Sequence, residues 1–548
     1  MSANTAAAAV LWHKAVAALE QGDSGAARAL CLRLLAELPQ HRGALELLAR
    51  LAMESGDLNE CESWLRQALA LAPNNGNLLT NLAVVRRQQG DAAGATELLE
   101  RAAGGTPPHG PAVVQLALVL KQAGRDHEAV ARLEPIIAAG GASAGVLALQ
   151  AQLLERLNRL DEARDHAEAA LALDPSEPVA HLLLAELDLR AGRPADALDR
   201  IGHLPPAATH SSANAALAHY LASQAHDSLA HPDAAYRSAE KANRILAEDY
   251  FRRHRGDEGP YAPPAVRVIG QWLRTLPHGG EAPKDPPCDP PPVFLLGFPR
   301  SGTTLVEQML RRHPGIAAVE EKELLAPLIA PYLARPEDLD ALADPAAAPR
   351  RDIRRRYVED ARAAALAAEG QIVVDKLPLN SVFLPIIGQL FPEARVLLAL
   401  RDPRDVCLSC FLQSFGLNAA MAQFLDLGTT AAYYGAVMDN ALATMERLPM
   451  RVQPLRYEAV VDDPEAEARR MLDFLGLPWD PAVLAYRTGL ENRLVNTPSR
   501  SQVSRPLYRS SVGRWRRYGQ HLAPVLPGLD GFAERLGYRS PQQDGSRA

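Results

Sequence analysis

Cysteine is scarce in this chain. Its 548 residues include five: Cys31, Cys61, Cys288, Cys407 and Cys410. A small, odd number spread over such a length does not make a disulfide framework. The Cys407-Leu-Ser-Cys410 spacing is open to a redox or zinc interpretation, but it has no second pair of ligands and lies in a helical pattern. We therefore expect buried thiols and no metal site.

Long apolar runs and blocks of one charge are also missing. No run of 18 apolar residues occurs, so we expect no transmembrane span. Residues 1–10 are rich in alanine but lack the basic start of a secretory signal, and the cytoplasm is the expected location. The net charge of −7 is spread without long blocks, which argues against nucleic-acid binding. We find no sequence signal for an oligomeric state.

A small turn residue recurs every 34 positions in the first 200 residues. The series is Gly22, Gly56, Gly90, Gly124, Asn158 and Gly192. Five positions after each of these stands another small residue: Ala27, Cys61, Ala95, Ala129, Ala163 and Ala197. A glycine supplies the left-handed turn between two antiparallel helices, and a small side chain lets those helices approach closely. The pattern therefore predicts a series of helical pairs.

The 34-residue period resembles the tetratricopeptide repeat, with six units over about residues 7–208. Residues 212–247 read as further helix, either a degenerate repeat or a cap. We predict an all-α solenoid over residues 7–250, because each unit leaves an apolar face that only its neighbour can bury. Its concave groove would bind a peptide or a partner protein, and the alternative is a spacer or a dimerisation element.

The composition changes after residue 250. We predict a linker over residues 251–291, since the stretch 283–292 holds six prolines and only 266–276 reads as a short amphipathic piece. Beyond it, buried strands expected at 292–298, 371–374, 395–400 and 452–456 alternate with helical patterns. The prediction for residues 292–540 is an α/β domain with a parallel sheet and a site at the carboxyl ends of its strands.

The first of these strands leads into a glycine-rich loop, Gly297-Phe-Pro-Arg-Ser-Gly302-Thr303-Thr304. Its spacing is that of a P-loop, whose backbone N–H groups and following helix cradle an anion. A nucleotide triphosphatase has Lys where this chain has Thr303, and we see no acidic strand end suited to hold a metal. The loop therefore favours a smaller anion held without metal, with a P-loop kinase as the alternative.

The segment Pro299-Arg-Ser-Gly-Thr-Thr-Leu305 is similar to the 5′-phosphosulfate loop of sulfotransferases that use 3′-phosphoadenosine 5′-phosphosulfate (PAPS). The resemblance covers about residues 292–525 and is greatest to the tyrosylprotein branch. By this resemblance the chain is identified as a member of the tetratricopeptide-repeat-containing sulfotransferases. It implies that the donor's 5′ end is held by five consecutive residues: Arg300, Ser301, Gly302, Thr303 and Thr304.

Two further stretches carry the resemblance. Arg401 and Ser409, eight residues apart across a strand end and the next helix, look like the family's 3′-phosphate site, although Gln413 stands where the family can have another Arg. A helix-capping Arg–Asp cluster is the competing interpretation. Residues 492–529 contain no Asp or Glu, and the resemblance assigns cofactor contacts there to Ser499 and Arg514, and earlier to Tyr457. A solvated basic face would explain that stretch equally.

Sulfuryl transfer requires a general base and a cation near the leaving oxygen. The resemblance places the base eight residues after His313-Pro, at Glu321, with Glu320 next in line if the alignment slips. It makes Lys376 the transition-state cation and Arg300 a second group acting on the sulfuryl or phosphate oxygens. We expect a structural role for His313.

The acceptor hydroxyl is not specified by these motifs. The tyrosylprotein resemblance suggests protein tyrosine, but that branch follows its Glu with basic residues, and here Lys322-Glu323 mixes the signs. A small alcohol, glycan or lipid acceptor remains an alternative. So does a repeat scaffold whose sulfotransferase domain is inactive.

Overall fold

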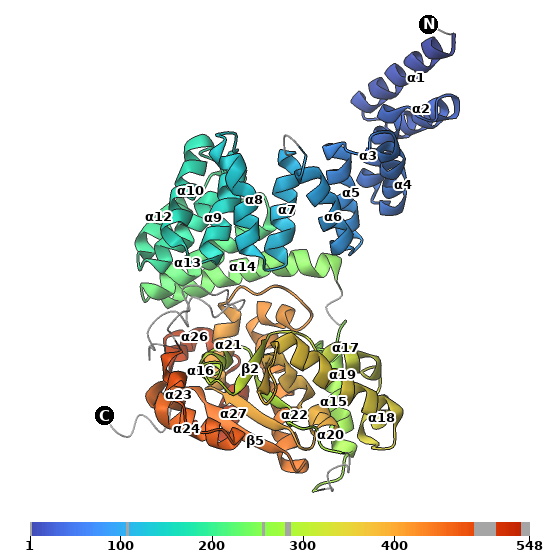
Figure 1. Cartoon of the computed structure of the whole chain (residues 1–548). Helices are drawn as coiled ribbons and strands as arrows, with labels where there is room; N and C mark the ends of the chain where they lie inside the picture. Colours follow the sequence, from blue (N-terminus) through green and yellow to red (C-terminus); the bar gives the residue numbers. More distant parts are fainter. Residues whose placement is uncertain (1–2, 106–108, 255–257, 280–285, 487–510, 539–548) are drawn as a thin grey trace. The chain divides into compact units, whose positions relative to one another are not determined.

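A computed structural model describes residues 3–105, 109–254, 258–279, 286–486 and 511–538 of the chain (Figure 1). Contacts between residues divide the chain into two compact units, Met1–Ala180 and His181–Ala548.

Unit 1 consists of helices that pack as consecutive antiparallel pairs. They are α1 (Ala3–Glu20), α2 (Ser24–Glu37), α3 (Arg42–Ser55), α4 (Leu58–Leu71), α5 (Gly76–Gln88), α6 (Ala92–Ala103), α7 (Gly110–Gln122), α8 (Asp126–Ala138), α9 (Ala144–Arg156) and α10 (Leu160–Leu173). The six residues of the 34-residue turn series are all left-handed, with φ between 60° and 87°. The small residue five positions after each is buried. The predicted repeat pattern is confirmed.

The helical pattern continues across the unit boundary and through the start of unit 2. Its elements are α11 (Pro178–Arg190), α12 (Pro194–Gly202), η1 (Pro206–Thr209), α13 (Ser212–Ser228) and α14 (Pro232–Arg253). Helices α13 and α14 form a seventh antiparallel pair, which is the further helix expected over residues 212–247.

The rest of unit 2 is built on a five-stranded sheet whose neighbouring strands are all parallel. The strands are β1 (Val293–Gly297), β2 (Ile316–Glu320), β3 (Ile372–Lys376), β4 (Arg395–Leu400) and β5 (Arg451–Arg456), in the order β2-β3-β1-β4-β5. The parallel sheet and four of its strands were predicted. Strand β2 was missed because Ile316-Ala-Ala-Val is too short and too weakly apolar to read as a buried strand.

Helices cover both faces of this sheet. Phe294 and Leu296 of β1 face one apolar layer, and Val293 and Leu295 face the other, as the alternation of a strand requires. The first layer includes α15 (Pro263–Thr275), α19 (Ala348–Ala365), α20 (Leu384–Leu390), α21 (Pro403–Phe411), α22 (Leu427–Arg447) and α27 (Leu526–Arg535), and the second includes α16 (Thr303–Leu310) and α24 (Pro464–Leu475).

Short elements complete the unit. They are α17 (Ala326–Ile329), η2 (Ala330–Tyr332), η3 (Pro336–Leu339), α18 (Asp340–Ala343), η4 (Pro378–Phe383), η5 (Met421–Leu425), α23 (Tyr457–Asp462), η6 (Pro481–Ala485), η9 (Arg514–Tyr518) and α26 (Gly519–Leu522).

The core of unit 2 extends into segments expected to lie outside the catalytic domain. Ala235 and Ala239 of α14 are fully buried in the same apolar layer as β1, and so is Trp272 of α15, within the predicted linker. The contact boundary at residues 180/181 also falls inside the predicted repeat array. The ranges 7–250, 251–291 and 292–540 therefore remain a prediction of which parts of the chain fold independently. In the structure, α14 and α15 pack in the core of unit 2.

Cysteines and long apolar runs, which are scarce in the sequence, can be compared with the structure. Cys407 and Cys410 are buried free thiols on α21, as expected, and burial raises the pKa of both. Among the described residues, no helix is both long and apolar enough to cross a membrane. The cytoplasmic location stays a prediction.

Candidate active site

The glycine-rich loop joins the carboxyl end of β1 to the start of α16. Gly302 caps α16 with a φ of 95° and no side-chain cap, and Arg300 also has a positive φ, of 73°. The first-turn N–H groups of a helix have no intrahelical partner, so Thr303 and Thr304 present donors at a positive helix end. A Cβ at Gly302 would lie 2.5 Å from Cδ2 of Tyr457. Glycine is therefore required both by the turn and by the close approach of this ring.

Arg401, Ser409 and Arg300 come together beside that loop. The Nε group of Arg300 donates to Oγ of Ser409 at 3.0 Å, and Nη1 of Arg401 donates to the carbonyl of Arg300 at 3.1 Å. The Arg401 guanidinium also lies 4.8 Å from the centre of the Tyr457 ring. Four of the residues proposed from the sequence thus meet where β1 and β4 end.

Arg401 has the surroundings of a group that binds an anion. It is only 7% exposed, its Nε has no hydrogen-bond partner, and it forms no ion pair among the described residues. Its Nη2 donates to the carbonyl of Ser511 at 2.6 Å. A buried guanidinium that forms no salt bridge favours an anionic ligand, because burying an incompletely paired charge is costly.

Glu321 and Lys376 form an ion pair at the carboxyl ends of two adjacent strands. Nζ of Lys376, the last residue of β3, lies 2.8 Å from Oε1 of Glu321, which directly follows β2. The N–H group of Glu321 also donates to the carbonyl of Lys376 at 2.8 Å, and Glu321 has a φ of 47°. The Lys376 side chain is fully buried, whereas that of Glu321 is 28% exposed. Glu321 can therefore meet a substrate while it remains paired.

Asp375, which precedes Lys376 in β3, is a second carboxylate close to this lysine in sequence, but its side chain is directed elsewhere. It points to the opposite face of the sheet, where the hydroxyl group of Tyr357 donates to its Oδ2 at 2.8 Å. Burial raises the pKa of Asp375 to about 7, against the opposing effects of Tyr357 and Lys376.

Glu307 is a member of this cluster that the sequence analysis missed. It is fully buried on α16, with Oε2 3.4 Å from Nζ of Lys376 and Oε1 2.9 Å from Nη1 of Arg311. Lys376 therefore lies between two carboxylates, Glu307 and Glu321. The signal was present in the sequence, because Glu307 is the one charged residue of the otherwise uncharged helix Thr303–Leu310.

Glu320, the alternative base, has different surroundings from Glu321. Burial and the neighbouring Glu307 raise its pKa to about 7, while Lys376 and Arg311 oppose the shift. Its Oε1 is buried without a hydrogen-bond partner, and its side chain is 14% exposed. Glu321 is the more accessible of the two, and it alone makes the short contact with Lys376.

Two predicted contacts remain, Arg514 and Ser499. The guanidinium of Arg514, on η9, pairs with Asp227 of α13 at 3.0 Å. Ser499 lies outside the described residues. A serine that the analysis did not assign, Ser511, contacts Tyr457, with Oγ 3.0 Å from the Tyr457 hydroxyl oxygen.

His313 lies three residues after the end of α16 and holds the following turn in place. Its Nδ1 accepts from the N–H group of Gly315 at 3.0 Å, and its Nε2 lies 2.9 Å from the carbonyl of Pro478. Both ring nitrogens are therefore engaged with the backbone, which confirms the structural role expected for this residue.

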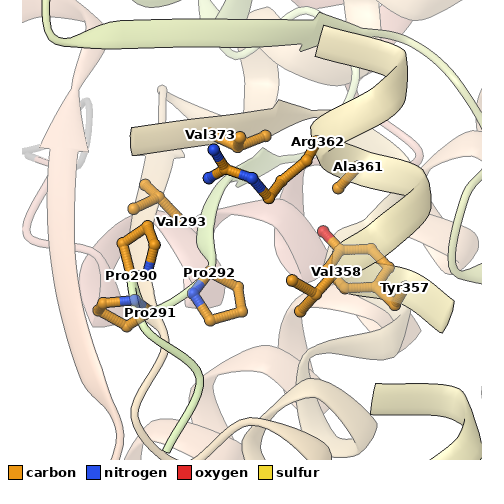
Figure 2. A pocket seen from close by; sticks show the side chains of 9 residues that line it. All are labelled: Pro290, Pro291, Pro292, Val293, Tyr357, Val358, Ala361, Arg362 and Val373. Carbon is orange, nitrogen blue, oxygen red and sulfur yellow. The ribbon is translucent and has the colours of Figure 1, made fainter. Parts of the chain in front are cut away.

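A pocket lies at the amino-terminal end of β1, beside the prolines that precede this strand (Figure 2). It offers about 30 Å³ and is lined by Val293 at the start of β1, Val373 near the start of β3, three prolines and Tyr357. Figure 2 shows one charged side chain there, Arg362. Because the glycine-rich loop follows the carboxyl end of β1, this pocket is not part of the candidate active site.

Comparison with known proteins agrees with this arrangement. Residues 291–481 match the sulfotransferase family, and residues 18–84, 86–153 and 156–220 match the tetratricopeptide repeat. An uncharacterized protein of Aquifex aeolicus is 28% identical over 410 residues, which are 71% of this chain and 51% of the relative. The chain thus spans about half the length of that relative.

Several of the similar proteins bear functional names, and two of them serve as examples. Protein-tyrosine sulfotransferase A of Caenorhabditis elegans is 26% identical over 324 residues, covering 54% of this chain and 79% of the relative. The sulfotransferase domain of the olefin synthase of Synechococcus PCC 7002 is 23% identical with a TM-score of 0.35, covering 48% of this chain and 99% of that domain. The chain thus contains segments that match the tetratricopeptide repeat and, after them, a segment that matches the sulfotransferase family.

Proposed function

We propose that residues 292–540 transfer a sulfuryl group from PAPS to an acceptor hydroxyl. The observation that carries the proposal is the Glu321–Lys376 pair at the strand ends of a domain whose anion loop has Thr303 in place of a Walker lysine. Such a loop offers hydrogen-bond donors but no metal-bridged triphosphate site. The match to the sulfotransferase family supports the same chemistry.

The donor would lie across the carboxyl ends of β1 and β4. In this proposal the loop residues Arg300, Ser301, Gly302, Thr303 and Thr304 hold the 5′-phosphosulfate. Arg401 and Ser409 hold the 3′-phosphate, and the unpartnered Nε of Arg401 suits that anion. Tyr457, Ser499 and Arg514 complete the set of proposed donor contacts, on the strength of the family resemblance.

The reaction needs one proton transfer and one group transfer. The Glu321 carboxylate takes the proton of the acceptor hydroxyl as the acceptor oxygen forms its bond to sulfur. The bond between sulfur and the bridging phosphate oxygen breaks, and its electron pair stays on the 5′-phosphate. The Lys376 ammonium, which is buried and already oriented by two carboxylates, stabilises that charge, and Arg300 of the loop is the second cation in this proposal.

We propose a protein tyrosine as the acceptor. The named protein-tyrosine sulfotransferases among the relatives support this choice, and the repeat array offers a surface on which a protein partner could bind. To test it, labelled sulfate is followed from PAPS into a cell lysate and the product is fractionated. Label in tyrosine of protein supports the proposal, whereas label in a small alcohol, glycan or lipid replaces the acceptor.

Nucleotide binding tests the donor. Isothermal titration should show that adenosine 3′,5′-bisphosphate binds without magnesium and more tightly than AMP, since each charged hydrogen bond to the 3′-phosphate contributes about 1.5–3 kcal/mol. Arg401→Ala should remove most of that difference and leave AMP binding nearly unchanged. Equal affinity for the two nucleotides would exclude a PAPS site, and tight binding of ATP with magnesium alone would indicate a kinase. Binding without any transfer activity would indicate an inactive scaffold.

A further inference from the structure

The segment Ser511–Tyr518 lies against the candidate donor site and is fastened there by its backbone. Both oxygens of the buried Asp405, on α21, accept from this segment, from the N–H groups of Gly513 at 2.7 Å and Trp515 at 2.8 Å. At its start, Ser511 contacts Arg401 through its carbonyl and Tyr457 through its hydroxyl. The orientation of Arg401 therefore depends on where this segment is held.

A second carboxylate fastens the other end of the segment, and it comes from the last helical pair. Asp227 of α13 lies 3.2 Å from Nε and 3.0 Å from Nη2 of Arg514, which makes the contact bidentate. The hydroxyl group of the buried Tyr518 donates to the same carboxylate at 2.6 Å. Asp227 thus contacts three side chains of the segment, those of Arg514, Tyr518 and, at 3.5 Å, Arg517.

Helix α14 likewise contacts the candidate site, through α21, the helix that carries Ser409. The Nδ2 group of Asn243 donates to the carbonyl of Phe411, the last residue of α21, at 3.0 Å. The ring of Tyr236 stacks between Phe411, at 4.8 Å, and His521, at 4.1 Å. Both helices of the pair therefore contact elements that bear residues of the candidate site.

We propose that Asp227 is a positioning residue for the donor site, and that the α13–α14 pair is a built-in part of that site. The inference rests on the proposed function. Asp227 holds Arg514 and Tyr518, these hold the segment, and Ser511 at its start orients Arg401, whose Nε has no hydrogen-bond partner. A partly buried hydrogen-bond network of this kind keeps a binding group at its productive angle, so loosening its far end weakens binding.

The test compares Asp227→Asn with a matched control in the full-length chain. Asp233→Asn is the control, because Asp233 belongs to the same helical pair and contacts His521 but is 62% exposed. Isothermal titration with adenosine 3′,5′-bisphosphate should show about a 5- to 20-fold loss of affinity for Asp227→Asn and less than about a 2-fold change for Asp233→Asn. The KM for PAPS should rise in proportion while kcat stays within about 2-fold.

Tyr518→Phe is a second variant, since it removes one donor to Asp227 without leaving a buried charge. It should lose about 2- to 5-fold in affinity, and its melting temperature without nucleotide should match that of the wild type. Wild-type affinity in both variants would overturn the inference, as would an equal loss in Asp233→Asn or a fall in kcat alone. Failure of the wild type itself to bind the nucleotide would overturn the proposed function as well.

Discussion

The repeat array and the sulfotransferase domain are held together over different distances along the chain. In the array, polar contacts join neighbouring repeats, as between Arg28 and Glu60, 32 residues apart, or Arg156 and Asp126, 30 apart. In the sulfotransferase domain, Arg300 reaches Ser409 over 109 residues and His313 reaches Pro478 over 165. Local, periodic contacts can be read from a sequence, whereas long-range contacts that build a site cannot.

The α13–α14 pair belongs to both patterns, since it continues the helical series and lies in the core of unit 2. Removing residues 1–250 should therefore cost the domain at least about 3 kcal/mol of unfolding free energy, because Ala235, Ala239 and Tyr236 leave a cavity in its core. Removing residues 1–176, just before α11, should spare adenosine 3′,5′-bisphosphate binding.

Thermal melting and titration of the two truncated chains measure this difference. If the chain that lacks residues 1–250 melts at the same temperature as the chain that lacks residues 1–176, then α14 does not stabilise the sulfotransferase domain. The boundary between the two units would then not reflect a difference in stability. Turnover of a protein acceptor should fall in both truncated chains if the array presents that acceptor.

Two substitutions separate the base from the cation within the site. Glu321→Gln keeps the shape but removes the proton acceptor, so kcat should fall by roughly 10²–10⁴ while nucleotide affinity barely changes. Lys376→Ala should also slow transfer, because it removes the charge beside the leaving oxygen. A more acidic phenol as acceptor should partly restore Glu321→Gln and leave Lys376→Ala impaired.

The neighbouring carboxylate supplies the control for this experiment. Glu320→Gln should keep most of the activity, because its side chain is less accessible and makes no short contact with Lys376. If Glu320→Gln is inactive while Glu321→Gln turns over normally, the two roles are exchanged. Full activity in both variants would exclude a carboxylate base.

A substitution in the array should have effects that stay local. Ala163→Leu places a larger side chain at a fully buried position where helices α9 and α10 meet, which should cost about 1–3 kcal/mol. Ala169→Leu, at an exposed position of the same helix, should be nearly neutral. Hydrogen exchange should show the loss in unit 1, with nucleotide binding unchanged. A parallel loss of nucleotide affinity would contradict the independence of unit 1.

The smallest expected effect concerns pH and the charge cluster. Burial raises the pKa of Glu320 from 4.5 to about 7. The folded state then binds this proton more tightly than the unfolded state, so the contribution of Glu320 to stability falls as pH rises from 4.5 to about 7. The melting temperature of Glu320→Gln minus that of the wild type should therefore be about 2–4 °C larger at pH 8 than at pH 5. Glu323→Gln, at an exposed position, should show no such pH dependence.

Part of the candidate site could be predicted because it is written in contiguous motifs. The loop through Thr304, the Arg401–Ser409 spacing and Lys376 at a strand end each occupy a few adjacent residues. The structure brings Glu321 to Lys376 and Arg300 to Ser409, although their roles stay predictions. Ser511 was missed because a serine in a basic stretch carries no local signal.

Residues contributed by distant segments could not be predicted. Nothing near Asp227 in the sequence indicates that it meets Arg514, 287 residues away. Glu307 carried a signal, an isolated charge in an otherwise uncharged helix, but its partner Lys376 lies on a strand that is 69 residues further along the chain. Strand β2 is stabilised by its pairing with β3 more than by its own two alanines.

The sequence by itself determined the helical period, the left-handed turns and the anion loop, because each depends on residues within one repeat or one strand–turn–helix unit. Only the tertiary structure decided that Lys376 is held between Glu307 and Glu321, and that α13 and α14 belong with the sulfotransferase domain. Those outcomes follow from burial and charge pairing between segments far apart in the chain, which act only once the sheet has assembled.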